Sequence, residues 1–275
     1  MQGERTNLMI VDALNLAFRW KHQGATIFAE EYVKTVASLA QSYKAKHVII
    51  VSDWGSSTFR KGIYPEYKQN RAEMQAQQTE AEAAYFEVFF EEFLHALDLL
   101  RDRYPMFRFK GVEADDIAAF LCEFVQSKYS PVTYDHIWLV SSDRDWDLLV
   151  GEKVSRFSYV TRKETTLETW SEMYDFPPEH YASVKAIMGD TGDNVIGVNK
   201  IGPKTAAKLI AEYDNVWDLI ANMPLPGKYV YIKNLNEFGA EKLAINAQLV
   251  DLVTYCKDAV GEENINIIKE TLEAL

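Results

Sequence analysis

Short runs of apolar and β-branched residues alternate along this chain with longer stretches whose apolar residues recur at helical spacing. The short runs, at residues 6–12, 46–53, 106–111, 135–143 and 154–161, predict strands. The longer stretches at residues 28–45 and 112–126 predict helices between those strands. Because strands that alternate with helices are typical of a mainly parallel sheet, we expect an α/β domain.

A long insertion separates the second and third predicted strands. Residues 54–71 are polar, contain glycine and are interrupted by Pro65, so we expect a loop or irregular structure there. Residues 71–103 are rich in Glu, Gln and Ala at first and in Phe and Leu later. They predict one long helix or two, polar at the start and packed at the end.

The pattern changes near residues 170–178. Two prolines open a predicted helix over residues 177–190, and the remainder of the chain has helical spacing. We therefore predict an α/β domain at residues 1–175 and a small all-α domain at residues 176–275.

Composition limits the class of protein. With 275 residues, 48% of them hydrophobic, the chain has enough apolar side chains for a large core, which excludes disorder. No apolar run approaches the roughly 20 residues that span a bilayer, and the N-terminus has no signal-peptide pattern. We expect a cytoplasmic protein without a membrane partner. Cys122 and Cys256 lie among apolar residues and are interpreted as buried thiols.

The net charge of −12 argues against a polyanionic partner. Basic residues nevertheless gather in two segments of the chain. They are Arg60, Lys61, Lys68 and Arg71 in the first segment and Lys200, Lys204 and Lys208 in the second. Local charge decides whether a protein grips a phosphate backbone, so nucleic acid remains a candidate partner.

Carboxylates recur at five separated places that are predicted strand ends or helix starts. They are Asp12, Asp53, the group Glu113, Asp115 and Asp116, the pair Asp143 and Asp145, and the pair Asp190 and Asp193. In parallel sheets ligands bind beyond the carboxyl ends of the strands. Hard divalent cations prefer carboxylate oxygens, and two such ions can hold both reacting oxygens of a phosphoryl displacement. Each acid alone is also explained as a strand end or a turn residue; the set as a whole predicts a metal site.

A glycine-rich turn at residues 197–206 precedes a predicted helix and lies among Lys200, Lys204 and Lys208. Gly202 allows the backbone to approach a phosphate, and the amides of the following helix point at the anion. We favour a phosphate-binding turn over a plain turn.

The basic segment before residue 71 allows two interpretations. It is either a solvated charged face or a cationic element opposite the acidic edge. In the second interpretation Lys68 and Arg71 hold the scissile phosphate and offset charge in the transition state, and Tyr67 stacks on a base.

Six segments, in this order, resemble the flap endonuclease and 5′-nuclease family, most closely its bacteriophage branch. They are MIVDALN, YPEYKQNR, GVEADD, SSDRDWD, IMGDTGDN and IGPKTA, between Asn7 and Tyr255. The family includes the 5′-nuclease domain of bacterial DNA polymerase I. The resemblance implies a PIN-like (resolvase-like) nuclease core and a helical arch at about residues 62–103. It also implies a helix–three-turn–helix DNA-binding unit with a helix-hairpin-helix motif at about residues 185–212.

The resemblance also implies roles for individual residues. The metal ligands would be Asp12, Asp53, Glu113, Asp115, Asp116, Asp143, Asp145, Asp190 and Asp193, with Asp190 and Asp193 in a second, looser group. The catalytic residues at the base of the arch would be Tyr67, Lys68 and Arg71. DNA would contact Arg60, Lys61, Lys200, Gly202, Lys204 and Lys208, and the carbonyls of Val198 and Ile201 would hold K⁺.

The implied function is a structure-specific 5′ nuclease that uses two Mg²⁺ ions, for which Mn²⁺ substitutes. Its substrates would be DNA with a 5′ flap, a 5′ overhang or a nick, and RNA–DNA junctions, in replication and primer removal. We expect a monomer in the cytoplasm of a bacterial host. Three alternatives are a PIN-type ribonuclease, an inactive structure-specific DNA-binding protein and a metal-dependent phosphatase.

Overall fold

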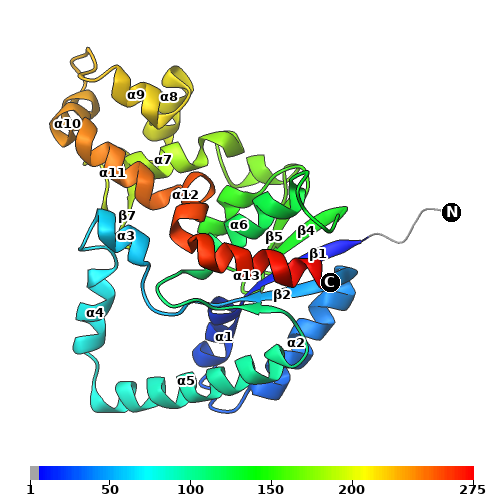
Figure 1. Cartoon of the computed structure of the whole chain (residues 1–275). Coiled ribbons are helices and arrows are strands. Elements are labelled where there is room, and N and C mark those ends of the chain that lie inside the picture. The colour runs from blue at the N-terminus through cyan, green and yellow to red at the C-terminus, as the bar shows by residue number, and fades with distance from the viewer. Residues whose placement is uncertain (1–5) are drawn as a thin grey trace.

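A six-stranded sheet forms the centre of the molecule in the computed structural model, which describes residues 6–275 (Figure 1). The strand order is β3-β2-β1-β4-β5-β6. The strands are β1 (Asn7–Asp12), β2 (Ala45–Val51), β3 (Met106–Phe107), β4 (His136–Val140), β5 (Val154–Ser158) and β6 (Lys163–Thr165). All neighbours pair in parallel except β6, which is antiparallel to β5. The prediction of a mainly parallel sheet is confirmed; β6 was not predicted.

Strand β1 is buried on both faces of the sheet. Met9 and Val11 enter one hydrophobic core, and Leu8 and Ile10 enter the other. Alternate side chains of a strand point to opposite faces, so β1 reads as a continuous apolar run. Helices α1 (Ala13–His22), α2 (Ala29–Ser42) and α5 (Glu80–Arg101) supply the first core, and α6 (Ala114–Gln126) supplies the second.

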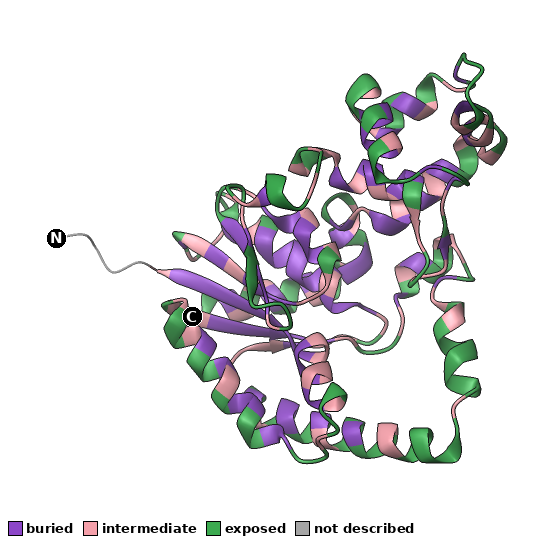
Figure 2. Cartoon of the chain, turned by 180° about the vertical axis from the view of Figure 1, so that it is seen from behind, coloured by how far each residue is buried: buried purple, intermediate pink, exposed green. Residues whose placement is uncertain are grey.

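The insertion after β2 forms three helices. They are α3 (Thr58–Ile63), α4 (Gln69–Ala76) and α5. Helix α4 buries no residue, and α4 and the start of α5 stand apart from the sheet layers in both views (Figures 1 and 2). The structure thus has two helices over residues 71–103, divided before a capping box at Thr79. The loop predicted for residues 54–71 was wrong at α3, whose side chains are fixed by tertiary contacts that local sequence does not encode.

A helical unit follows the sheet. It contains α7 (Tyr181–Met188), α8 (Pro203–Tyr213), α9 (Val216–Ala221), α10 (Val230–Phe238) and α11 (Ala240–Val250). The short 3-10 helices are η1 (Arg144–Leu149), η2 (Trp170–Glu172) and η3 (Pro178–His180). Between α7 and α8 the chain forms an unpredicted two-stranded hairpin, β7 (Gly189–Asp190) and β8 (Val195–Ile196). Any Cβ at Gly197 would overlap the carbonyl of Met188, so glycine is required there.

The last two helices pack on the sheet domain. Helices α12 (Leu252–Val260) and α13 (Glu262–Glu273) contribute Cys256, Ile268 and Leu272 to the core that contains α6. Helices α12 and α13 therefore belong to the core of the α/β domain, although they follow the all-α unit in the sequence. We had expected all of residues 176–275 to form one all-α domain. Cys122 and Cys256 are buried free thiols, as predicted. Within residues 6–275 no helix is both long and apolar enough to span a bilayer.

The packing of α13 gives a first testable prediction. Replacing the fully buried Ile268 by alanine should lower the free energy of unfolding by about 2–5 kcal/mol, because it removes apolar contacts and leaves a cavity. The adjacent Ile267 is 44% exposed and serves as the matched control for Ile268→Ala. Urea denaturation of the full chain measures both variants. Equal losses for the two would show that α13 is not part of the core.

Candidate metal centre at the carboxyl edge of the sheet

Three neighbouring strands place carboxylates at one edge of the sheet. Asp12 is the last residue of β1, Asp53 follows β2, and Asp143 follows β4. Asp12 accepts hydrogen bonds from the amide of Asn15 and from the Ser141 hydroxyl, at 3.2 and 2.8 Å. Asp53 accepts a 2.6 Å bond from the Ala114 amide at the start of α6. These bonds hold the carboxylates at the edge and orient them.

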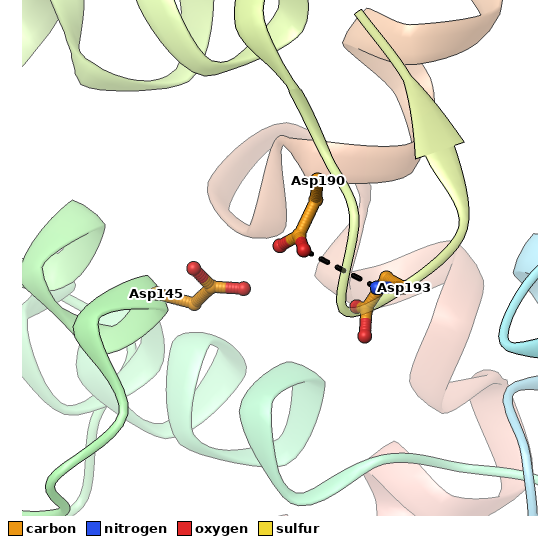
Figure 3. Close-up of side chains that lie close together, drawn as sticks. All are labelled: Asp145, Asp190 and Asp193. Atoms are coloured by element: carbon orange, nitrogen blue, oxygen red, sulfur yellow. Dashed lines mark hydrogen bonds between the residues drawn. The ribbon is translucent and has the colours of Figure 1, made fainter. Parts of the chain in front are cut away.

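These side chains line one acidic pocket of about 280 Å³. Its charged lining residues are Asp12, Asp53, Asp115, Asp143, Asp145, Asp190, Asp193, Lys68 and Arg71. Seven of the nine predicted ligands therefore meet in one place. Among the described residues, Asp145, Asp190 and Asp193 offer oxygens that all lie within 4.8 Å of one another (Figure 3).

Burial and the crowding of carboxylates raise the pKa of several of these side chains. Burial raises the pKa of Asp12 to about 8, and the neighbouring Asp53 adds to this rise. Burial and the charges of Asp143 and Asp53 raise the pKa of Asp115 well above its usual range. Burial also raises the pKa of Asp145 to about 6, against the opposing pull of Lys185. Carboxylates in such a site bind protons or cations tightly, and their oxygens suit a hard divalent ion.

Asp116 and Glu113 lie outside the acidic pocket. Asp116 is 0% exposed and accepts bonds of 2.7 and 2.8 Å from the Arg60 guanidinium, one to each oxygen. Glu113 accepts from Lys68 at 2.6 Å and from Arg60 at 3.0 Å. Burial alone would raise the pKa of Glu113, but Lys68 and Arg60 hold it below its usual value. In this structure the two acids bind Arg60 and Lys68 and do not line the acidic pocket, so their role as metal ligands stays a prediction.

Arg60 is a further correction, because it was predicted to contact DNA. It is 1% exposed, and its Nε donates to the carbonyl of Leu249 at 2.8 Å. Helix α3 packs between the sheet domain and α11, which encloses the guanidinium with Asp116 and Glu113. No sequence pattern distinguishes the buried Arg60 from its exposed neighbour Lys61.

The base of the arch contacts the acidic pocket. The Lys68 ammonium lies 2.6 Å from Glu113 and 3.7 Å from Asp193, and Arg71 lies 2.6 Å from Asp193. Tyr67 is 3% exposed, with its hydroxyl 3.1 Å from Glu113 and 2.9 Å from Asp193. Its burial contradicts the prediction that it stacks on a base.

Lys185 was not predicted from the sequence. It lies on α7, and its ammonium pairs with Asp145 and, at 2.9 Å, with Asp190. In the sequence it is one basic residue on an amphipathic helix, and no motif marks it.

The predicted DNA-contacting residues of the helical unit lie around the start of α8. Lys200, Gly202, Lys204 and Lys208 are exposed, and in the described structure none of these lysines forms an ion pair. Gly202 is the N-cap of α8, and Pro203 follows at the first helical position. This arrangement leaves the helix N-terminus and three cations facing solvent.

An acidic pocket at the carboxyl edge of a mainly parallel sheet, with Lys68 and Arg71 at its rim, suits the chemistry of a metal-dependent nuclease. Residues 7–175 match the N-terminal resolvase-like domain of the 5′-3′ exonucleases, and residues 176–271 match their C-terminal SAM fold. The chain belongs to the 5′-3′ exonuclease family.

Individual relatives agree with this assignment. The flap endonuclease of Escherichia phage T5 is 48% identical over 261 residues, which cover 94% of this chain and 88% of that protein. DNA polymerase I of Bacillus subtilis (strain 168) is 29% identical over 279 residues, which cover 96% of this chain and 29% of the polymerase. The match to the polymerase relates this chain to one part of it.

Solved structures show the same fold. A bacteriophage T5 flap endonuclease variant in a pseudo-enzyme–product complex with DNA and metal ions has a TM-score of 0.90 at 46% identity, covering 97% of both chains. The T5 5′-exonuclease with bound zinc has a TM-score of 0.91 at 46% identity, covering 97% of this chain and 98% of that one. The catalytic core of Rad2 with DNA, at 15% identity and a TM-score of 0.52, covers 98% of this chain and 87% of that one and shares the fold alone.

The cation layer behind the pocket gives a second prediction. Replacing Arg60 by methionine leaves Asp116 and Glu113 buried without this cation, and we expect a loss of about 3–5 kcal/mol of stability. The control is Arg101→Met, whose pair with Asp98 is exposed and should contribute at most about 1 kcal/mol. Guanidinium denaturation of the full chain compares them. A loss no larger than that of the control would contradict a supporting role for Arg60.

Proposed function

We propose that this protein is a structure-specific 5′ nuclease that hydrolyses DNA phosphodiesters at 5′ flaps and 5′ ends. The observation that carries the proposal is the convergence of seven carboxylates with Lys68 and Arg71 in one pocket. The products would be a 5′-phosphate and a 3′-hydroxyl. The related phage T5 flap endonuclease, whose complex contains DNA and metal ions, supports this choice.

Two groups of carboxylates would each hold one divalent ion. The first metal group is Asp12, Asp53, Asp115 and Asp143, and the second metal group is Asp145, Asp190 and Asp193. We propose Mg²⁺ as the physiological ion, with Mn²⁺ as a substitute, because both prefer carboxylate oxygen. When bound, such ions make a water more acidic and neutralise charge on the attacking and leaving oxygens.

Lys68 and Arg71 would bind the scissile phosphate. Glu113 and Asp193 hold the Lys68 ammonium at the rim of the pocket, so its position is fixed before substrate arrives. The Arg71 side chain is 56% exposed and is oriented by Asp193. Preorganised cations of this kind stabilise charge that develops on the phosphate in the transition state. Tyr67 would act through its hydroxyl, which supports Glu113 and Asp193.

The helical unit would bind the duplex part of the substrate. Lys200, Lys204 and Lys208 would contact phosphates together with Gly202 at the start of α8, and Lys61 would contact the strand near the arch. The proposed K⁺ site uses the carbonyls of Val198 and Ile201; the first of these also accepts a 3.2 Å bond from the Ile201 amide. We propose the sheet domain, with α12 and α13 packed on it, as the nuclease domain, and the unit of α7 to α11 as the duplex-binding domain.

The proposed substrates are DNA with a 5′ flap, a 5′ overhang or a nick, and RNA–DNA junctions. Removal of flaps and primers during replication follows from that activity. We propose that the protein acts as a monomer in the cytoplasm of a bacterial host cell, with no membrane partner.

The carboxylates of the second metal group provide a direct test. Asp145→Asn and Asp190→Asn should each lower the single-turnover rate on a 5′-flap substrate in Mg²⁺ by at least about 100-fold. DNA affinity should change much less, because both substitutions leave the phosphate-binding cations in place. Gel analysis of end-labelled substrate measures the rate, and fluorescence anisotropy measures affinity. Asp175→Asn, an exposed carboxylate outside the pocket, is the control. Equal losses in rate and affinity would remove these residues from the metal site.

The same gels separate the alternatives. Labelled single-stranded RNA and flap DNA are compared with Mg²⁺ and with EDTA. Metal-dependent cleavage of RNA alone would favour a ribonuclease, and the absence of any metal-dependent cleavage would overturn the proposed function.

Proton competition at Asp12 gives a prediction for pH. Its folded-state pKa of about 8 lies above that of an unfolded Asp, so the metal-free fold loses stability as pH rises toward 8. Mg²⁺ binding requires the ionised carboxylate, so affinity falls as pH decreases through that value. We therefore expect the rise in Tm on adding Mg²⁺ to be larger at pH 8.5 than at pH 6. Thermal unfolding at constant ionic strength measures it, and a rise independent of pH would contradict the assignment of Asp12.

A further inference from the structure

An ammonium group lies inside the second metal group. Lys185 pairs with Asp145 and, at 2.9 Å, with Asp190, and its side chain is only 16% exposed. The carboxylates of Asp145 and Asp190 point toward each other beside the β7–β8 hairpin (Figure 3). An ammonium in contact with these oxygens and a divalent ion on the same oxygens would repel each other at close range.

The first metal group differs in this respect. In the part of the chain that the structure describes, none of Asp12, Asp53, Asp115 and Asp143 takes part in an ion pair. Their partners are amides, the Ser141 hydroxyl and the indole N–H of Trp146. One group is therefore open to an ion, and the other already holds an internal cation.

We infer that Lys185 is the internal counter-cation of the second metal group, which neutralises Asp145 and Asp190 in the metal-free protein and has to leave when a divalent ion binds there. This inference rests on the proposed function, since it concerns the second of its two ions. It has a direct consequence: the second group binds its ion more weakly than the first, because every binding event includes the displacement of Lys185.

The structure provides space for the displaced side chain. A cavity of about 540 Å³ borders Lys185 and is lined by Val184 and Met188 of the same helix and by the cationic side chains Arg144 and Lys204. The flexible four-carbon stem of lysine allows the ammonium to turn into this cavity without a backbone shift. Carboxylates of Asp145, Asp175 and Asp190 line the same cavity, so the displaced ammonium remains beside negative charge.

Mn²⁺ titration of the full chain without DNA tests the inference. At pH 8.5, calorimetry together with the electron paramagnetic resonance signal of free Mn²⁺ gives the number of sites and both dissociation constants. In Lys185→Met we expect the weaker constant to fall by about tenfold and the tighter one to stay unchanged, since a competing cation has been removed. Lys204→Met, which removes one positive charge from the same cavity, should leave the weaker constant within about twofold.

A second measurement keeps the test decisive if Lys185→Met does not fold. In wild-type protein labelled with ¹³C at the lysine ε-carbon, the signal of Lys185 is identified by its absence in Lys185→Arg. Adding Mg²⁺ should move this signal only at concentrations that fill the second group. A signal that does not move would overturn the inference.

The outcomes separate the inference from the function on which it rests. Wild-type protein that binds a single ion would contradict the two-ion function, and the inference with it. Protein that binds two ions, but whose weaker constant is unchanged or raised in Lys185→Met, would overturn the role of Lys185 alone.

Discussion

The arrangement of this molecule depends on the repulsion among seven carboxylates in one pocket. At separations near 4 Å, like charges raise one another's free energy by about 1 kcal/mol in water and by several times that in a partly buried site. Burial, together with the neighbouring charge of Asp53, raises the pKa of Asp12 to about 8. The chain offsets the repulsion at the rim with its own cations, Lys68, Arg71 and Lys185. At the centre, Asp12, Asp53, Asp115 and Asp143 form no ion pair among the described residues, and Lys68 and Arg71 act on Asp53 only from a greater distance.

The cations at the rim are themselves held from behind. Arg60 binds Asp116 with two parallel bonds, contacts Glu113 and reaches the carbonyl of Leu249 on α11. Glu113 in turn binds Lys68. The buried Arg60 guanidinium thus joins α3, the start of α6 and the helical unit. Because Glu113 contacts both Arg60 and Lys68, Arg60 also helps to position Lys68 at the rim of the pocket. Removing Arg60 alone would cost more stability than the intact pair contributes, because Asp116 and Glu113 would stay buried without this cation.

The sequence predicts the part of this site that depends on sheet topology. Asp12, Asp53 and Asp143 follow apolar runs, and parallel pairing brings strand ends to one edge, so their convergence could be derived before the structure was known. Arg60, Asp116 and Lys185 could not be assigned in this way. Arg60 and Lys61 are adjacent basic residues of the same short helix, yet one is enclosed by α11 and the other is exposed. That difference arises from contacts between segments almost 190 residues apart, such as Arg60 with Leu249, which no local pattern contains. The position of α13 on the sheet domain was missed for the same reason.

The arch and the second metal group form one hydrogen-bonded assembly. The Lys68 amide donates to the carbonyl of Asp193, Asn70 donates to the carbonyl of Thr191, and Asn194 donates to the carbonyl of Glu66. The turn between β7 and β8 that carries Asp190 and Asp193 is therefore attached to the base of the arch, whereas α4 beyond it buries no residue. Asp193 takes part in both, since its carboxylate belongs to the second metal group and also holds Arg71. In the proposed two-ion site, an ion bound to Asp193 would compete with Lys68 and Arg71 for the same carboxylate, so by linkage the contacts of the arch would change the affinity for that ion.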